Sequence, residues 1–279
     1  MDAQLDPQLH HQAEQERIGQ VYRGWHGGAA LARYAWHRPD VVRQQGMRSR
    51  VLSHMLATTL GTDLGGVRVI DVGCGTGGFL RQLIDWGATP AHLTGTELQQ
   101  DRLDLARPRT APEVKWVCGP LSALPAASAD LVSAQTVLSS VLDPELRQRL
   151  ASDMWRVLKP GGWCLVFDFR YNNPRNPHVR KVRREELRAY WPGHREQYQT
   201  LLLAPPLGRA LAAMPDPAHR SAGQPGTAAA VALRLYGAKG TMSRMQAGAC
   251  RAWDGRLRVQ TPSSGQCEHP RILCFVTIR

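Results

Sequence analysis

The sequence predicts a doubly wound α/β fold, because strand-like and helix-like segments alternate from Val67 to Leu203. A glycine-rich stretch separates the first β-branched segment from a segment with helical spacing. A long amphipathic segment then leads into an apolar, strand-like one at 163–169. With 279 residues, 43% of them hydrophobic, the chain can bury one substantial core.

The expected elements follow one another along this region. Asp143 and Pro144 predict an N-cap and a first helical position, and Lys159–Gly162 predict the end of that helix. Helices are expected near 79–86, 99–107, 144–158 and 183–190, and strands at 67–72, 92–97, 114–118, 130–137, 163–169 and 197–203.

Three regions are expected. Residues 1–60 predict a helical N-terminal extension that could cover a site, and 61–211 form the core. Residues 212–279 predict an irregular tail, because they are rich in Pro, Gly and Ala, with a final strand at 271–278.

The glycine-rich stretch fits two ligand patterns. Gly73–Gly78 satisfies G-x-G-x-x-G, which is typical of dinucleotide sites, and Asp71–Gly77 reads D-x-G-x-G-x-G. In both cases a ligand meets backbone amides at the start of a helix. Glu97, after the next strand, could accept hydrogen bonds from ribose hydroxyls in either case. Neither feature separates the two cofactors.

Asp71 favours the second pattern, since its carboxylate could attract the ammonium of a methionine group. The turn Leu158-Lys159-Pro160-Gly161-Gly162, which joins the amphipathic helix to the next strand, points the same way. With these motifs the chain resembles class I S-adenosylmethionine-dependent methyltransferases of the type-11 kind over residues 67–169.

The resemblance implies a Rossmann-like, seven-stranded sandwich whose sheet is mostly parallel with one antiparallel strand. It also implies S-adenosyl-L-methionine as the methyl donor. The residues expected to bind this donor are Asp71, Gly73, Cys74, Gly75, Thr76, Gly77, Glu97, Leu98, Pro120, Leu121 and Gln135.

The sequence departs from the family pattern after the third strand. Gly119-Pro120-Leu121 stands where the family usually has G-D-A, so the carboxylate that receives the adenine amine is missing. Backbone groups at Leu121 and apolar contact from Leu98 are expected to hold the base with weaker selectivity. A narrower similarity to bacterial methyltransferases of unknown acceptor spans 167–209 and ends near Leu211.

Two side chains past the fifth strand are candidates for proton transfer to or from an acceptor. Asp168 could act as a base, although a structural carboxylate paired with an arginine is the plainer interpretation. His178 could act likewise, or serve as a surface or capping residue. No metal ligand is expected, since the six cysteines lack C-x-x-C spacing.

The formal charge of +12 suits an anionic partner, but an Arg-rich composition typical of GC-rich genomes is the favoured explanation. Seven Arg and Lys residues lie between 170 and 188, either as a solvated surface or as an anion site for the acceptor. The acceptor is expected to be a small metabolite or glycan precursor, which could be anionic. Nucleic acid is disfavoured because no RNA-binding motif occurs.

No apolar run reaches the length of a membrane span and no signal sequence is evident, so a cytoplasmic location is expected. Three alternatives stay open: an RNA or protein methyltransferase, a catalytically silent donor-binding module, and an NAD(P) oxidoreductase.

Overall fold

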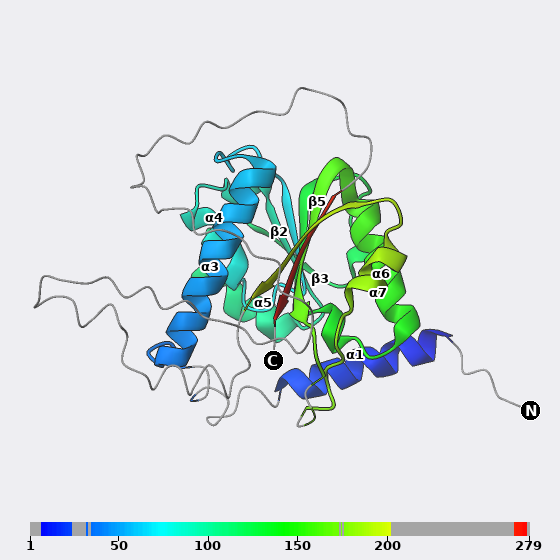
Figure 1. The fold of residues 1–279 in the computed structure, drawn as a ribbon. Coiled ribbons are helices and arrows are strands. Elements are labelled where there is room, and N and C mark those ends of the chain that lie inside the picture. The colour runs from blue at the N-terminus through cyan, green and yellow to red at the C-terminus, as the bar shows by residue number, and fades with distance from the viewer. Residues whose placement is uncertain are drawn as a thin grey trace, which may run out of the picture. The chain divides into compact units, whose positions relative to one another are not determined.

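In the computed structural model the strands form one sheet with the order β3-β2-β1-β4-β5-β7-β6 (Figure 1). The structure describes residues 7–23, 32, 35–172, 174, 176–201 and 271–277. The strands are β1 (Val69–Val72), β2 (Leu93–Glu97), β3 (Lys115–Cys118), β4 (Ala129–Gln135), β5 (Leu158–Phe169), β6 (Arg195–Leu201) and β7 (Arg271–Thr277). The Rossmann-like, mostly parallel sheet with flanking helices is therefore confirmed.

The prediction of one antiparallel strand in the sheet is wrong. Each neighbouring pair in the sheet is parallel, including β7 with β5 and with β6. An antiparallel neighbour can follow through a short hairpin, whereas a parallel one requires a connection of a dozen residues or more. The chain between β6 and β7, residues 202–270, is long enough for such a crossover and lies outside the described residues.

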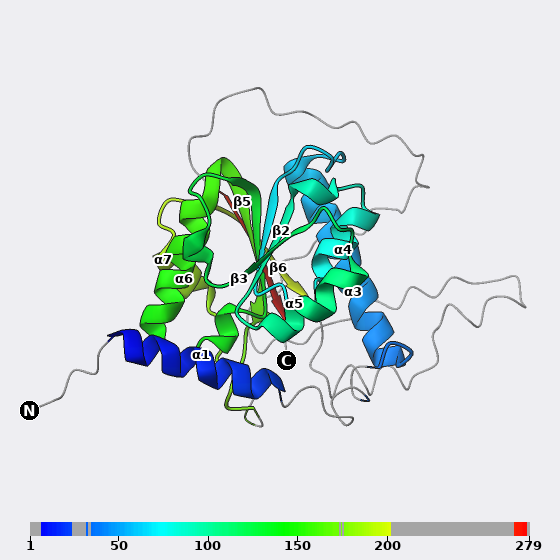
Figure 2. The ribbon, with the colours of Figure 1, turned by 180° about the vertical axis from the view of Figure 1, so that it is seen from behind.

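The described residues include six α-helices, which are α1 (Pro7–Arg23), α3 (Pro39–Leu60), α4 (Gly78–Asp85), α5 (Gln100–Ala106), α6 (Pro144–Val157) and α7 (Arg184–Tyr190). Figures 1 and 2 show α3 and α4 on one side of the sheet and α6 and α7 on the other. Within the described part of the chain, no helix is long and apolar enough to cross a membrane.

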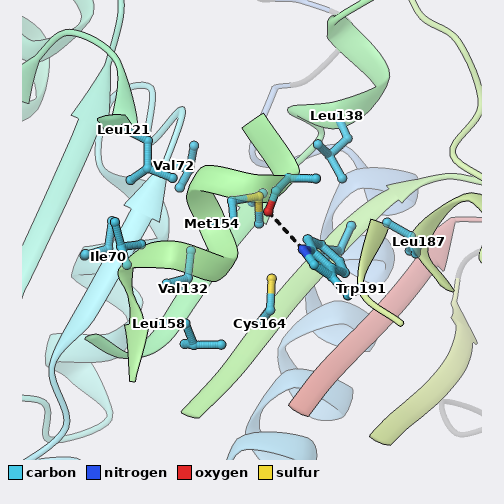
Figure 3. Packing of buried hydrophobic residues seen from close by; sticks show 14 of the residues in the cluster. Ile70, Val72, Leu121, Val132, Leu138, Met154, Leu158, Cys164, Leu187 and Trp191 are labelled. Carbon is cyan, nitrogen blue, oxygen red and sulfur yellow. Dashed lines mark hydrogen bonds between the residues drawn. The ribbon is translucent and has the colours of Figure 1, made fainter. Parts of the chain in front are cut away.

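Alternate side chains of the central strands pack into two separate cores, as expected for strands buried on both faces. Val69 and Leu131 face α3 and α4, where they join Leu52 and Leu83. Ile70, Val132 and Val166 face α6 and α7 in the second core. Figure 3 shows this second core, in which Trp191 Nε1 donates a hydrogen bond to the Ala151 carbonyl, 2.9 Å away. The sheet is thereby fixed from both sides.

The helix expected at 144–158 is confirmed by α6. The Asp143 side chain caps it by accepting from Leu146 N at 2.8 Å. The turn Lys159–Gly162 ends this helix as expected, but it also belongs to β5, which begins at Leu158 and not at 163. A register shift at Ala129 and Leu131 of β4 accommodates the additional residues.

The strand order reverses beside β1, which pairs with β2 on one side and with β4 on the other. In open parallel sheets a ligand crevice forms at the carboxyl ends of the strands at such a switch point. The topology therefore places the ends of β1, β2 and β4 around one candidate site.

Candidate functional site

A cleft of about 1100 Å³ opens at the carboxyl ends of these strands. The glycine loop after β1 forms one wall, and α1 and α3 contribute others. Of the residues expected to bind the donor, those that line the cleft are Asp71, Gly73, Cys74, Gly75, Thr76, Glu97, Leu98, Pro120, Leu121 and Gln135.

The glycine loop needs glycine at two positions. Gly73 and Gly75 have φ angles of 58° and 56°, in the left-handed region that side chains disfavour. A Cβ atom on Gly75 would lie 2.9 Å from Arg102 Nη2, and one on Gly73 would lie 2.8 Å from Val137 Cγ2. The loop thus presents bare backbone to the cleft. Gly77 precedes α4 with φ 75° and is not part of the lining.

Glu97 ends β2 and is 7% exposed. Its Oε2 accepts from Gly75 N at 3.0 Å, and its Oε1 accepts from Leu98 N at 2.8 Å and Gln99 N at 3.3 Å. These bonds tie the end of β2 to the glycine loop. The carboxylate is therefore held in place at the cleft surface, where it can accept from a ligand.

Asp71 lies on β1 opposite Ser133 of β4 in the sheet register. Ser133 Oγ donates to Asp71 Oδ1 at 2.5 Å. Burial raises the pKa of Asp71 to about 7, although the Ser133 bond and the positive charge of Arg48 act against this shift. A buried carboxylate at the cleft surface would be stabilised by a cationic ligand group.

Gln135 ends β4 and carries polar atoms that need a partner. Its Oε1 and Nε2 are both buried, and neither has a hydrogen-bond partner among the described residues. Thr136, which follows it, has a φ of 59°, a strained value for a β-branched residue. Unsatisfied amide atoms in a cleft indicate a site for a polar ligand.

The wall formed by the segments after β2 and β3 is mainly apolar. Leu98 is 40% exposed and Leu121 is 3% exposed. Gly119 and Pro120 lie between β3 and Leu121, and Ser122 follows. This lining would suit the flat face of a base more than it would recognise an exocyclic amine.

Neither candidate for proton transfer lines the cleft. Asp168 is buried, and its Oδ2 accepts from Ser139 N at 3.0 Å while Oδ1 accepts from Phe169 N at 2.9 Å. Burial raises the pKa of Asp168 to about 6. His178 is exposed, and its backbone N donates to Asn176 Oδ1 at 3.1 Å.

The cleft lining also includes residues that the sequence interpretation did not assign to it, among them Tyr22 of α1, Arg48 of α3 and Arg102 of α5. The Arg102 guanidinium lies 4.7 Å from the centre of the Tyr22 ring. Only Arg48 leaves a sequence signal, since it stands one turn before Leu52 on the stripe of α3 that faces the core.

Residues 69–162 match the family model described as a methyltransferase domain. The biotin biosynthesis bifunctional protein BioHC of Cellvibrio japonicus is 36% identical over 120 residues, which are 42% of this chain and 22% of that protein. Phthiotriol/phenolphthiotriol dimycocerosates methyltransferase of Mycobacterium tuberculosis is 35% identical over 126 residues, 44% of each chain. An S-adenosylmethionine-dependent methyltransferase structure from Mesorhizobium loti shows 31% identity over 36% of this chain and 45% of its own, with a TM-score of 0.31.

The chain thus matches a methyltransferase domain over residues 69–162. It spans less than half the length of the two curated relatives described above. The donor fits the residues present: the bare backbone at Gly73 and Gly75, the held carboxylate of Glu97 and the unsatisfied amide of Gln135.

Proposed function

We propose that this protein transfers a methyl group from S-adenosyl-L-methionine to an oxygen, nitrogen or carbon atom of a small metabolite or glycan precursor. The observation that carries the proposal is the cleft itself, in which Asp71, Glu97 and the glycine loop meet at the switch point of the sheet. The mycobacterial relative, which is named for methylating phthiotriol and phenolphthiotriol dimycocerosates, supports an acceptor other than a nucleic acid or a protein.

The donor's sulfonium supplies an already activated methyl group, so the chain mainly has to align the reactants and exclude water. In this proposal Glu97 accepts from the ribose hydroxyls, and Asp71 attracts the methionine ammonium. The Leu98 and Leu121 side chains contact the base. Gln135 orients polar groups beside the reacting centre through its amide.

Asp168 and His178 stay predictions for proton transfer. The bonds of Asp168 to Ser139 N and Phe169 N support a positioning role, because they fix the segment after β4 that borders the cleft at Ser140. In this arrangement Asp168 acts on the acceptor side through the backbone that it holds.

The domain organisation of the chain is part of the same proposal. Residues 1–60 form a helical extension whose α1 and α3 supply walls of the cleft, and residues 61–211 form the catalytic core, whose six strands β7 extends to a seven-stranded sandwich. A cytoplasmic location suits a small, soluble or anionic acceptor. Of the tail expected at 212–279, residues 212–270 lie outside the described residues, and β7 occupies Arg271–Thr277.

A second candidate function is a silent module that binds the donor without turnover. Pro120 favours it, since this residue stands where the family usually has a carboxylate for the base. Turnover with any member of a panel of small hydroxyl, amine and carboxylate acceptors would exclude this candidate.

Calorimetry with S-adenosylhomocysteine, the donor's product, tests the proposal. We expect a dissociation constant in the micromolar range, about −8 kcal/mol, and far weaker binding of NADH. The control is Gly75→Val, whose side chain would meet Arg102 and strain the loop, and it should abolish binding while the fold persists. Tight NADH binding, or normal binding by this variant, would overturn the assignment.

A further inference from the structure

The cleft is larger than the donor alone requires. Its volume is about 1100 Å³, whereas sites of about 300–1000 Å³ bury most of a drug-sized ligand. The residues assigned to the donor lie at the ends of β1, β2 and β4 and after β3. Another part of the lining comes from α1, from the segment between β4 and α6, and from α6 itself. The cleft therefore has room for a second molecule beside the donor.

This other part of the lining is an apolar groove between α1 and α6. Five half-buried side chains form the α1–α6 groove: Ile18, Val137, Val141, Leu146 and Leu150. Figures 1 and 2 show α1 crossing beside the start of α6. Because these side chains keep part of their surface in water, an apolar ligand that covered them would be stabilised.

Both walls of the groove are attached to the core of the protein. Arg17 Nη2 donates to Ser140 O at 2.6 Å and thereby holds α1 against the segment after β4. On the other wall, Val137 and Leu150 pack against the second core. Leu146 belongs to neither of the two described cores, so its side chain is available to a ligand.

The charges that border the groove are already compensated. Three charged residues of the lining have an ion-pair partner on their own helix: Glu14 with Arg17 at 2.6 Å, Arg149 with Glu145 at 3.4 Å and Asp153 with Arg156 at 3.0 Å. Among the described residues, these pairs leave no excess of either sign for an ionic ligand group. The groove therefore favours an uncharged occupant.

A polar feature without a partner lies at the end of β4. Both amide atoms of Gln135 are buried and lack a hydrogen-bond partner among the described residues. Val137, two positions later, begins the apolar lining. The amide oxygen can accept from a hydroxyl or an amine, and the amide nitrogen can donate. One polar group on a hydrocarbon body would match both features.

We propose that the α1–α6 groove binds the hydrocarbon body of the methyl acceptor, whose hydroxyl or amine lies at the Gln135 amide. The inference rests on the proposed function and narrows its acceptor to an amphiphile with one polar end. An acceptor that carries polar groups along its whole length is disfavoured, because the groove would bury them without hydrogen bonds.

The test measures binding of 1-hexanol, 1-octanol and 1-decanol by calorimetry to protein that is saturated with S-adenosylhomocysteine. The matched ligand is 1,6-hexanediol, which has the length of 1-hexanol but a second hydroxyl at the far end. The protein variants are Leu146→Gln and Leu105→Gln. Leu105 is the matched control, because it is an exposed leucine of α5 that does not line the cleft.

We expect the affinity of the unaltered protein to rise about fourfold for each added methylene, the factor that corresponds to about 0.8 kcal/mol. The diol should bind about tenfold more weakly than 1-hexanol. Leu146→Gln should weaken binding of 1-octanol about tenfold, whereas Leu105→Gln should bind it as the unaltered protein does. Ile18→Gln, on the opposite wall, should show the same loss and serves if Leu146→Gln does not fold.

Three results would overturn the inference: no binding of the alcohols, affinity that does not rise with chain length, or equal binding of 1-hexanol and the diol. Unchanged binding of 1-octanol by Leu146→Gln and Ile18→Gln would do the same. A larger loss of affinity for S-adenosylhomocysteine than for 1-octanol would assign the groove to the donor's base. If the unaltered protein does not bind S-adenosylhomocysteine, the proposed function itself fails, and the two failures are therefore distinct.

Discussion

At the scale of single residues, the site contains a carboxyl group whose protonation couples stability to ligand binding. Burial raises the pKa of Asp71 from its ordinary value of 3.8 to about 7. The folded state therefore binds more protons than the unfolded state between about pH 4 and pH 7. The free energy of unfolding falls as the pH rises through this window. A buried carboxyl group that lowers the free energy of unfolding at a cleft is typical of a group kept for function.

Asp71→Asn should remove the loss of stability that ionisation of the buried carboxyl group causes. Relative to the unaltered protein, its free energy of unfolding should rise between pH 4 and pH 7 and level off above pH 7, with an upper limit of about 4 kcal/mol from the shift in pKa. The raised pKa of Asp168 adds the same pH dependence to the free energy of unfolding of both proteins, so it cancels in the difference. Denaturant unfolding across pH 4–8 measures the difference. A difference that does not vary with pH would contradict the raised pKa, and unimpaired donor binding by the variant would contradict the ammonium site.

At the scale of elements, α1 forms a wall of the cleft that the core holds by specific bonds. Glu14 Oε1 accepts from Leu142 N at 2.7 Å, and Arg17 Nη2 donates to Ser140 O at 2.6 Å. The Tyr22 hydroxyl lies 2.8 Å from Ser140 Oγ. All three side chains contact the segment that follows β4. The helix and the segment after β4 that borders the cleft are thereby coupled.

Loosening α1 should speed release of the donor. The double variant Glu14→Ala/Arg17→Ala removes two anchors, and we expect the dissociation rate of S-adenosylhomocysteine to rise by about tenfold, as for a wall that limits release. Stopped-flow displacement measures the rate. Glu16→Ala is the matched control, because Glu16 is exposed on the same helix. Unchanged rates in the double variant would show that α1 does not retain the donor.

The sequence predicted the elements whose local signals agree with their packing. The strands β1, β2 and β4, with the Asp143 cap of α6, lie close to their expected positions. The prediction of one antiparallel strand was wrong, because strand direction depends on a connection and not on local pattern. The place of Arg48 was missed for a similar reason, since only the packing of α3 on the sheet brings it beside Asp71.

At the scale of the whole molecule, the net charge of +12 is a weak guide to the partner. Part of the basic run between 170 and 188 is paired internally: Arg184 and Arg188 both contact Glu196. Glu186 forms ion pairs with Arg147 at 2.9 Å and with Arg180 at 3.7 Å. These ion pairs favour a structural role for the basic run and count against a role as an anion site.

The central claim is that the cleft at the ends of β1, β2 and β4 holds the methyl donor. A crystal structure of the complex with S-adenosylhomocysteine tests it most directly. We predict that both ribose hydroxyls lie within hydrogen-bond distance of the Glu97 carboxylate, about 2.6–3.2 Å, with the amino-acid group beside Gly73. A nucleoside bound elsewhere, or a Glu97 carboxylate without contact to the ribose, would contradict the account.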